Sequence, residues 1–302
     1  MALSQSDLHR GSTTAYSTLV KCETLDIIFP RGPNILKPDI KTTVLFPRMI
    51  CYFGNDKLVA FDQKCNRVGL YEDVCNTQNR SSSIIHSLPN NYCYTYGSST
   101  ALDGNRFAIS CPYIPVLTIF SSENTGQLKE DGKLNIGGKC YDIDYINGKL
   151  VVCFRDPPKI SVLDMKTGFI HSIENEPKGN QLFNVPSHVA IDICNGQEMI
   201  YVSDNASWGL RRLTKIDLHG NMLASFLSLE EETPKQVITV GDGNILFVHK
   251  GIRLMSENCQ EVVKLLDESH TASVLCMSYS KQRNLLFVVK DKSSEIVVYK
   301  LT

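Results

Sequence analysis

The sequence predicts an all-β protein, a six-bladed β-propeller of four-stranded antiparallel blades. An apolar strand recurs six times, and successive copies start 40 to 50 residues apart, at Leu58, Phe107, Leu150, Ile200, Ile245 and Leu285. This period is typical of propeller blades and related arrays. One such unit cannot bury both faces of its own sheet, but a closed ring of units can.

The recurring strand is the second of its blade (strand b), and a tight turn precedes it. In five units the turn contains Asn, Asp or Gly: Asn55-Asp56-Lys57, Asp103-Gly104-Asn105, Asn147-Gly148-Lys149, Asn195-Gly196-Gln197 and Asp242-Gly243-Asn244. These residues tolerate left-handed backbone angles and mark hairpins, so strands a and b are expected to pair antiparallel. The sixth unit has Lys281-Gln282-Arg283-Asn284, which is a weaker hairpin signal.

Strand c follows in all six units and strand d in the first five. Strand c is apolar, as in Ile160–Leu163 and Leu213–Ile216, and strand d is clearest in Phe169–Ile173, Met222–Phe226 and Val262–Leu266. The polar stretches Glu72–Asn91 and Glu174–Asn184 are expected to be surface loops.

The sixth unit shows no strand d, whereas a strand-like segment, Thr18–Ile28, precedes the first unit. We expect this segment to supply the missing outer strand and to close the ring. The domain prediction is a disordered stretch over residues 1–14 and one propeller over residues 15–302, with residues 15–30 completing the last blade.

The composition excludes some partners. The chain of 302 residues carries a net charge of −1, which argues against DNA and against a broad basic surface for nucleic acid or membrane. It shows neither the apolar core of a signal peptide nor an apolar run long enough for a membrane helix, so a cytoplasmic location is expected. The 11 cysteines form no CxxC pair and are expected to be reduced core residues.

The fourth unit carries a family signal. Pro186–Asp192, then Ile200-Tyr201-Val202-Ser203-Asp204-Asn205, then Leu213–Asn221 with its Asp217-Leu218-His219-Gly220 turn, resembles an NHL repeat. The tripeptide at 205–207 is Asn-Ala-Ser rather than Asn-His-Leu, so the resemblance is to an NHL-like repeat. As a whole, the chain from about residue 15 looks like the C-terminal propeller of tripartite-motif (TRIM-NHL) ubiquitin ligases, especially divergent invertebrate members.

That resemblance implies a recognition module. In the family the propeller selects protein substrates or RNA, while RING and B-box zinc modules carry the ubiquitin chemistry. Those modules need closely spaced Cys and His ligands, which this sequence does not contain. We therefore expect no enzymatic activity from this chain alone.

Catalytic and metal motifs are also missing from the sequence. It contains no G-x-S-x-G, P-loop or HExxH motif. His188 lies in an inner-strand phrase and could face the central channel, but without a placed partner it is expected to be structural. Asp142, Asp144 and Asp192 could contribute to a cation site in the channel, although the other blades offer no similar ligands. No catalytic residue, metal or cofactor is predicted.

The charges separate by type of connection. The b–c and d–a connections of a propeller share one face, and here the b–c segments are rich in Lys and Arg whereas the d–a segments, including Glu130, Asp131, Glu174 and Glu176, are acidic. Interleaved charges favour a protein or peptide partner over a nucleic-acid groove, which needs a continuous positive track. The candidate binding residues on this face are Arg67, Tyr113, Arg155, Lys159, Trp208, Arg211, Arg212, Lys250 and Lys290.

The leading hypothesis is a non-enzymatic propeller that binds a protein or peptide through its b–c/d–a face. Recognition of single-stranded or hairpin RNA is the first alternative, because aromatic and arginine side chains can stack bases and bind phosphate. A calcium-dependent hydrolase of the lactonase type, another activity found on six-bladed propellers, is the second.

Overall fold

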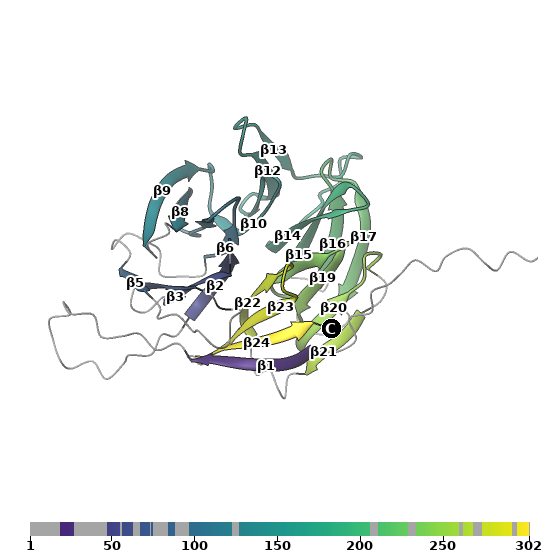
Figure 1. Cartoon of the computed structure of the whole chain (residues 1–302). Coiled ribbons are helices and arrows are strands. Elements are labelled where there is room, and N and C mark those ends of the chain that lie inside the picture. Colours follow the sequence, from purple (N-terminus) through teal and green to yellow (C-terminus); the bar gives the residue numbers. More distant parts are fainter. Residues whose placement is uncertain are drawn as a thin grey trace, which may run out of the picture.

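Six four-stranded sheets stand around a ring in the computed structural model (Figure 1). The structure describes residues 19–26, 47–54, 56–62, 67–72, 74, 84–87, 97–122, 127–205, 211–228, 234–259, 262–267, 274–291 and 295–301. These residues form 24 strands, and all neighbouring strands within a sheet are antiparallel. The predicted fold class is confirmed. In this described part of the chain, no helix has the length and apolarity needed to cross a bilayer.

Each blade runs outward from the channel in the order a, b, c, d. The inner strands a are β2 (Pro47–Phe53), β6 (Ser99–Ala101), β10 (Cys140–Ile146), β14 (Pro186–Cys194), β18 (Val237–Gly241) and β22 (Val274–Ser280). The strands b are β3 (Lys57–Asp62), β7 (Arg106–Ile109), β11 (Lys149–Arg155), β15 (Gln197–Asn205), β19 (Asn244–Val248) and β23 (Leu285–Lys290).

The two outer positions follow the same order. The strands c are β4 (Arg67–Tyr71), β8 (Val116–Ser122), β12 (Pro158–Asp164), β16 (Arg211–Asp217), β20 (Gly251–Met255) and β24 (Glu295–Leu301). The strands d are β5 (Ile84–Ser87), β9 (Leu128–Asn135), β13 (Ile170–Ile173), β17 (Met222–Ser228), β21 (Val262–Asp267) and, for the sixth blade, β1 (Leu19–Asp26).

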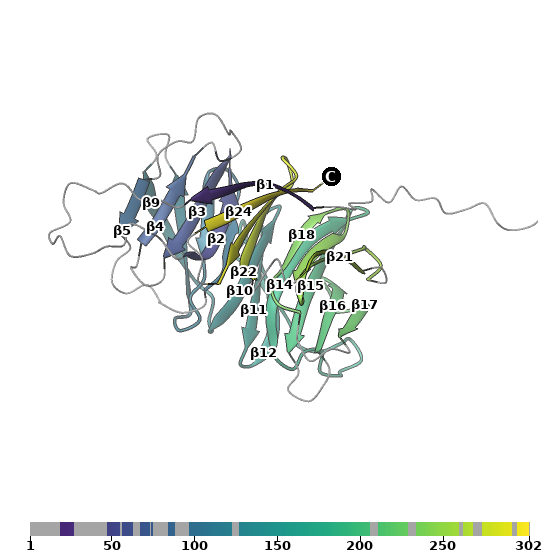
Figure 2. The ribbon, with the colours of Figure 1, turned by 90° about the horizontal axis from the view of Figure 1, so that it is seen from below.

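The N-terminal strand closes the ring. β1 pairs antiparallel with β24 from Leu19 opposite Leu301 to Asp26 opposite Glu295, and both lie at the edge of the sixth blade (Figures 1 and 2). The strand that the sixth unit lacks in its own sequence therefore comes from the other end of the chain, as predicted. Residues 1–18 and 27–30 lie outside the described residues, so the proposed domain bounds stay a prediction.

The a–b turns use the residues that the sequence indicated. Asn147 and Gly148 have φ angles of 48° and 84°, and in the sixth blade Asn284 has a φ of 55°. Most residues with a Cβ are strained at positive φ angles. Gly has no Cβ, and Asn tolerates these angles better than other side chains. The turn that gave the weaker signal is therefore also built around an Asn in the left-handed conformation.

Two predicted loops need correction. The stretch Glu72–Asn91 contains β5, which pairs with β4 as the outer strand of the first blade. Within Glu174–Asn184, Leu182 and Phe183 are fully buried in a core cluster, although the segment forms only an isolated bridge between Asn175 and Gln181. In both places a short apolar pair, surrounded by polar residues, finds a partner that the local sequence does not reveal.

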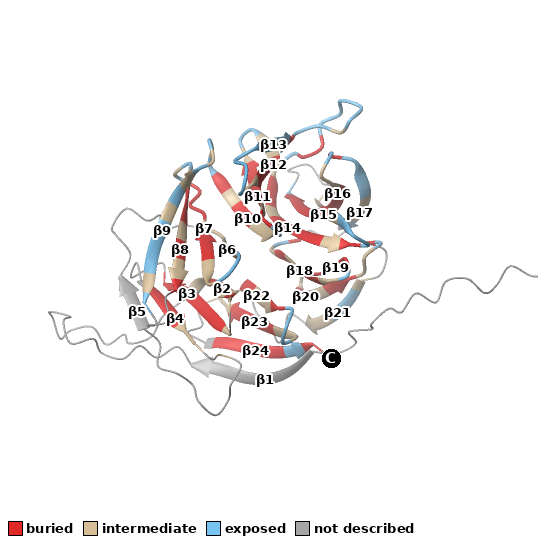
Figure 3. Cartoon of the chain, turned by 45° about the horizontal axis from the view of Figure 1, so that its top comes forward, coloured by how far each residue is buried: buried red, intermediate tan, exposed pale blue. Residues whose placement is uncertain are grey.

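The core lies between blades. Leu150 packs in a cluster shared by the second and third blades, and its neighbour Val151 packs in a cluster shared by the third and fourth. This alternation follows from the two-residue period of a strand whose sheet is covered on both faces. Figure 3 shows the result as mostly buried strands a to c and exposed stretches on the outer strands β9 and β17.

Six cysteines are free and buried: Cys51, Cys140, Cys153, Cys194, Cys259 and Cys276. For these residues the prediction of reduced core thiols is confirmed. Cys111 is disulfide-bonded, so the same prediction is wrong there. Cys111 follows the end of strand β7, where a side chain can reach another segment, whereas Cys51, Cys153 and Cys276 lie in strand interiors.

Candidate binding face at the mouth of the central channel

The inner strands line the channel with a free backbone edge, because strand a pairs on one side only. Unpaired N–H and C=O groups need other partners. Polar side chains of a neighbouring blade supply them. The Val189 N–H donates to Asp142 (2.9 Å), the Ile191 N–H to Asp144 (2.8 Å), and the Tyr52 N–H to Ser278 (2.8 Å).

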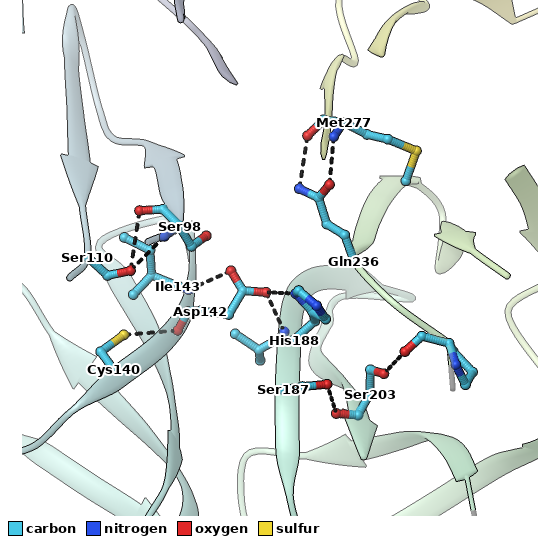
Figure 4. Close-up of polar contacts among 12 residues, drawn as sticks. Ser98, Ser110, Cys140, Asp142, Ile143, Ser187, His188, Ser203, Gln236 and Met277 are labelled. Atoms are coloured by element: carbon cyan, nitrogen blue, oxygen red, sulfur yellow. Dashed lines mark hydrogen bonds and ion pairs between the residues drawn. The ribbon is translucent and has the colours of Figure 1, made fainter. Parts of the chain in front are cut away.

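The remaining seams between blades are joined in the same way. Gln236 accepts from the Met277 N–H (2.6 Å) and donates to its carbonyl (3.0 Å), as Figure 4 shows. The Ser99 hydroxyl donates to the carbonyl of Ile50 (3.3 Å), and the Gly243 N–H donates to Asp192 (3.3 Å). The Thr100 hydroxyl donates to Asp144 (3.0 Å). The carboxylates of Asp142, Asp144 and Asp192 thus each accept hydrogen bonds from neighbouring blades.

His188 is the half-exposed member of this network. Its Nδ1 lies 3.1 Å from Oδ2 of the buried Asp142, which also accepts from the Val189 N–H, while Oδ1 accepts from the Ile143 N–H (Figure 4). A carboxylate oxygen only accepts, so this contact requires a proton on Nδ1. The structure supplies the oriented partner that the sequence could not place.

Asp144 lies two residues after Asp142 in strand β10. It accepts from the Tyr145 N–H (2.9 Å), from Thr100 and from the Ile191 N–H. The pKa of Asp144 is raised from 3.8 to about 6. Burial is the largest cause and the nearby charge of Asp142 adds to it, whereas the three hydrogen bonds act in the opposite direction.

The channel mouth on the b–c/d–a face has irregular backbone. In four inner strands the second residue is an extra one, so that two residues oppose one on strand b: Arg48, Tyr141, Ser187 and Leu275. Bulges bend a strand and re-aim side chains, and they are over-represented at functional sites. The strand entries at this face therefore present side chains that a regular ladder would direct elsewhere.

The opposite a–b/c–d face is fastened by polar contacts between blades. Arg283 forms a bidentate pair with Asp56, with N–O distances of 2.7 and 3.2 Å, and Lys281 pairs with Asp192 at 2.7 Å. Lys149 pairs with Glu198 in the next blade. These charges are already matched within the fold.

Arg155 and Lys159 flank the b–c connection of the third blade, as predicted. The guanidinium of Arg155 lies 4.0 Å from the ring centroid of Tyr141. The Lys159 ammonium lies 5.4 Å from the ring of Phe154 and 4.0 Å from a Glu174 oxygen. Both cations remain at the b–c/d–a face with no closer counter-ion among the described residues.

Arg211 and Arg212 are adjacent in β16 but differ in their surroundings. The Arg212 guanidinium donates to the carbonyl of Leu182, and its Nε lies 3.5 Å from the fully buried Asp204. Asp204 also accepts from the backbone N–H groups of the connection to the fourth blade, at 184 and 185. Arg212 therefore holds this connection in place. Arg211 is half-exposed and makes no ion pair within the described part of the chain.

The other candidates stand as follows. Tyr113 is 60% exposed in the b–c connection of the second blade. Lys250, with a φ of 45°, and Lys290 lie half-buried at b–c ends and have interactions within the fold. Arg67 begins β4, but its side chain is outside the described residues, and so is Trp208. No contact of this structure tests these residues as a binding site, which stays a prediction.

The acidic half of the predicted pattern needs one correction. Glu130 and Asp131 lie inside β9, not in a d–a connection, and Asp131 approaches Arg106 (3.8 Å) from the a–b/c–d half of the blade. The sequence reasoning also did not identify Tyr141. Its position directly before Asp142, at the entry of an inner strand, is the signal that could have marked it.

A metal site finds little support in this geometry. Among the described residues, no group of three or more His, Cys, Asp or Glu side chains lies close enough to hold one ion. Asp142, Asp144 and Asp192 each bind backbone N–H groups of the next blade instead.

Comparisons with known proteins show the fold alone. No protein-family model and no curated protein matches the sequence. Among solved structures 884 chains match, so the architecture is too common to indicate one function. One of them is Raptor from Chaetomium thermophilum, with a TM-score of 0.61 and 10% identity over 95% of this chain; the chain spans 29% of the length of Raptor. The propeller fold is confirmed, and the NHL-like family is not.

Proposed function

We propose that this chain is a non-enzymatic recognition module that binds a protein or peptide through its b–c/d–a face. One observation carries the proposal: two arginines of this face lack a carboxylate partner within the described part of the chain, although Arg48 of the same face pairs with Asp291 of another blade at 2.9 Å. On the a–b/c–d face, Asp56 and Asp192 neutralise cations from other blades. On the b–c/d–a face, Arg155 and Arg211 have no carboxylate partner in the described residues.

Exposed side chains of the right type accompany these cations. Tyr113 is largely exposed, and bulges re-aim residues at four of the six inner-strand entries of the same face. Aromatic residues and arginine contribute most of the energy in protein interfaces. The resemblance to TRIM-NHL propellers fits this proposal, since those domains select substrates for a ubiquitin ligase. Under that reading the chain would supply recognition and a partner module the transfer chemistry.

Site-specific photo-crosslinking tests the face. A photoreactive phenylalanine analogue at Tyr113 is expected to capture a protein from the native cell extract. The matched control is the same analogue at Phe169, which is 67% exposed in a c–d turn of the opposite face. Equal capture at both positions, or capture only at Phe169, would contradict the proposal.

RNA recognition is the first alternative. A gel shift with single-stranded and hairpin RNA at low salt tests it, because phosphate contacts weaken steeply as salt rises. Charge reversal at Arg211, with the exposed Lys166 of a c–d turn as a control, is the informative variant. Arg212 is unsuitable, because its replacement would disturb the connection that Asp204 holds.

A lactonase-type hydrolase is the second alternative. It would need a calcium site, and the inner-strand carboxylates of this chain are occupied by backbone N–H groups. Removal of calcium by a chelator is expected to leave the melting temperature unchanged. A fall in both the melting temperature and the hydrolysis of activated esters would favour the enzyme instead.

A further inference from the structure

Arg155 is held in one orientation at the channel mouth. Its guanidinium lies 4.0 Å from the centroid of the Tyr141 ring, and Tyr141 is the extra residue of the bulge between Cys140 and Asp142. A guanidinium that lies over an aromatic ring keeps its hydrogen-bonding edge free. The bulge therefore places an aromatic platform under an arginine at the entry to the third blade.

This arginine has no anionic partner among the described residues. Its Nε is buried and makes no hydrogen bond. Two buried carboxylates, Asp142 and Asp204, lie in the same region. Their charges and that of Arg155 all act on the pKa of the buried Cys153 thiol, so the three groups surround the same residue. Asp142 is occupied by His188 and two backbone N–H groups, and Asp204 by Arg212 and the 184–185 backbone.

A buried guanidinium N–H without a partner is costly, and such a group in a folded protein calls for an explanation. The two buried carboxylates nearby are committed elsewhere, and Arg155 as a whole is only half-buried, so its guanidinium is left with an external partner. Arginine presents a planar fork that matches a carboxylate or a phosphate with two parallel hydrogen bonds. The chemistry that Arg155 fits is therefore an oxyanion.

We propose that Arg155 on Tyr141 is a subsite for an oxyanion side chain of a bound peptide, either a carboxylate or a phosphorylated residue. This inference rests on the proposed function and specifies the partner as an acidic peptide segment. Lys159 lies at the other end of the same connection, and Arg211 begins strand c of the next blade, so further cations lie on the same face.

An extended segment suits this face. Its chain advances about 3.3 Å per residue, and it would meet Arg155 at the end of strand b of the third blade and Arg211 at the start of strand c of the fourth. The face also carries two exposed carboxylates, Asp156 and Glu174, which would repel further negative charge. We therefore expect a bound peptide with a few acidic side chains rather than a long acidic tract.

Nuclear magnetic resonance of the arginine side chains tests the subsite directly. The Nε–H signal of Arg155, assigned by its loss in Arg155→Lys, is followed while potassium acetate, inorganic phosphate or potassium chloride is added at constant ionic strength. We expect saturable shifts with acetate and phosphate and none with chloride. Equal shifts with chloride, or no shifts at all, would overturn the proposal.

Labelled peptides extend the test to the bound partner. The probes are a glutamate hexapeptide, a phosphoserine hexapeptide, a lysine hexapeptide and a uridine octanucleotide, measured by fluorescence anisotropy. We expect the acidic probes to bind and Arg155→Lys to weaken them about 10-fold to 100-fold, because it removes a charge-assisted bidentate contact. Tyr141→Phe keeps the ring and should bind normally, whereas Tyr141→Leu should bind weakly.

The controls separate this inference from the proposed function. Arg106→Gln, on the opposite half of its blade, should leave binding unchanged. A shift of Arg155 with the oligonucleotide alone would replace the acidic peptide by RNA. If a cellular protein crosslinks at Tyr113 but Arg155→Lys binds the acidic probes as well as the parent chain does, the binding face stands and the oxyanion subsite is refuted.

Discussion

Replacement of Asp144 by asparagine tests whether the channel network carries a titrating carboxylate. Asp144 links three blades, because it accepts from Thr100 of the second blade and from the Ile191 N–H of the fourth. Burial is the largest cause that raises its pKa, from 3.8 to about 6. Asparagine has the same shape but does not titrate.

The expected magnitude follows from that shift. A pKa that is higher in the folded state means that the folded protein binds the proton more tightly, so the contribution is fully present below about pH 4 and is lost as the pH rises through about 6. About two pKa units correspond to about 3 kcal/mol. Asp144 is only partly buried, and solvent screening reduces this to about 2 kcal/mol.

Urea unfolding of both proteins between pH 4 and 8 measures the effect. The free energy of unfolding of the parent chain minus that of Asp144→Asn should fall by about 2 kcal/mol as the pH rises, whatever constant offset the lost hydrogen bond adds. Asp164→Asn is the matched control. Backbone hydrogen bonds lower the pKa of this exposed carboxyl, so its difference should change only as the pH falls toward 4, and in the opposite sense. A flat difference for Asp144 would refute the reasoning.

Three further predictions concern the scaffold. Deletion of residues 1–30 should lower the melting temperature sharply because it removes the strand that pairs with β24, whereas deletion of residues 1–14 should leave it unchanged; equal melting of both would refute the closure. Asp204→Ala should cost about 3–5 kcal/mol in urea unfolding, since it leaves two N–H groups unpaired and removes the counter-ion of the half-buried Arg212, and a cost below about 1 kcal/mol would contradict this. Gly243→Ala should destabilise more than Gly179→Ala in thermal unfolding: both have positive φ angles, of 75° and 90°, but only at Gly243 would a Cβ lie 2.6 Å from a glutamate side chain. Equal losses would mean that crowding plays no part.

The fold could be predicted because its information is local. Turn residues such as Asn147 and Gly148 require positive φ angles, and the alternation of Leu150 and Val151 assigns them to two different seams. A fourth strand was predicted for the first blade, but its position, β5, was missed for the same reason. Its four residues lie in a polar stretch. Only their pairing with β4, as at Ile84 and Ile85, makes them a strand, and the sequence around them does not reveal that pairing.

The positions of the candidate binding residues could be predicted only in part, and their role in binding stays a prediction. Topology alone places Arg155 and Tyr113 at b–c connections, so the sequence was sufficient for their location. It could not separate Arg211 from Arg212. The side chain of Arg212 meets Asp204 and the carbonyl of Leu182, 30 residues earlier in the chain, and that contact exists only after the third and fourth blades have packed.

The His188–Asp142 pair shows how such contacts decide between catalysis and scaffolding. The geometry alone, an imidazole held by a buried carboxylate, is that of a general base. Yet Asp142 also receives the Val189 N–H, which is the free edge of the next blade, so the carboxylate would be needed there without any catalysis. The hydroxyls of Ser187 and Ser110 donate to backbone carbonyls, at 3.2 and 3.3 Å, and are not directed at the imidazole. Since a nucleophile must lie within hydrogen-bond reach of its base, the pair is better explained as the joint between two blades whose entries lie on the proposed binding face.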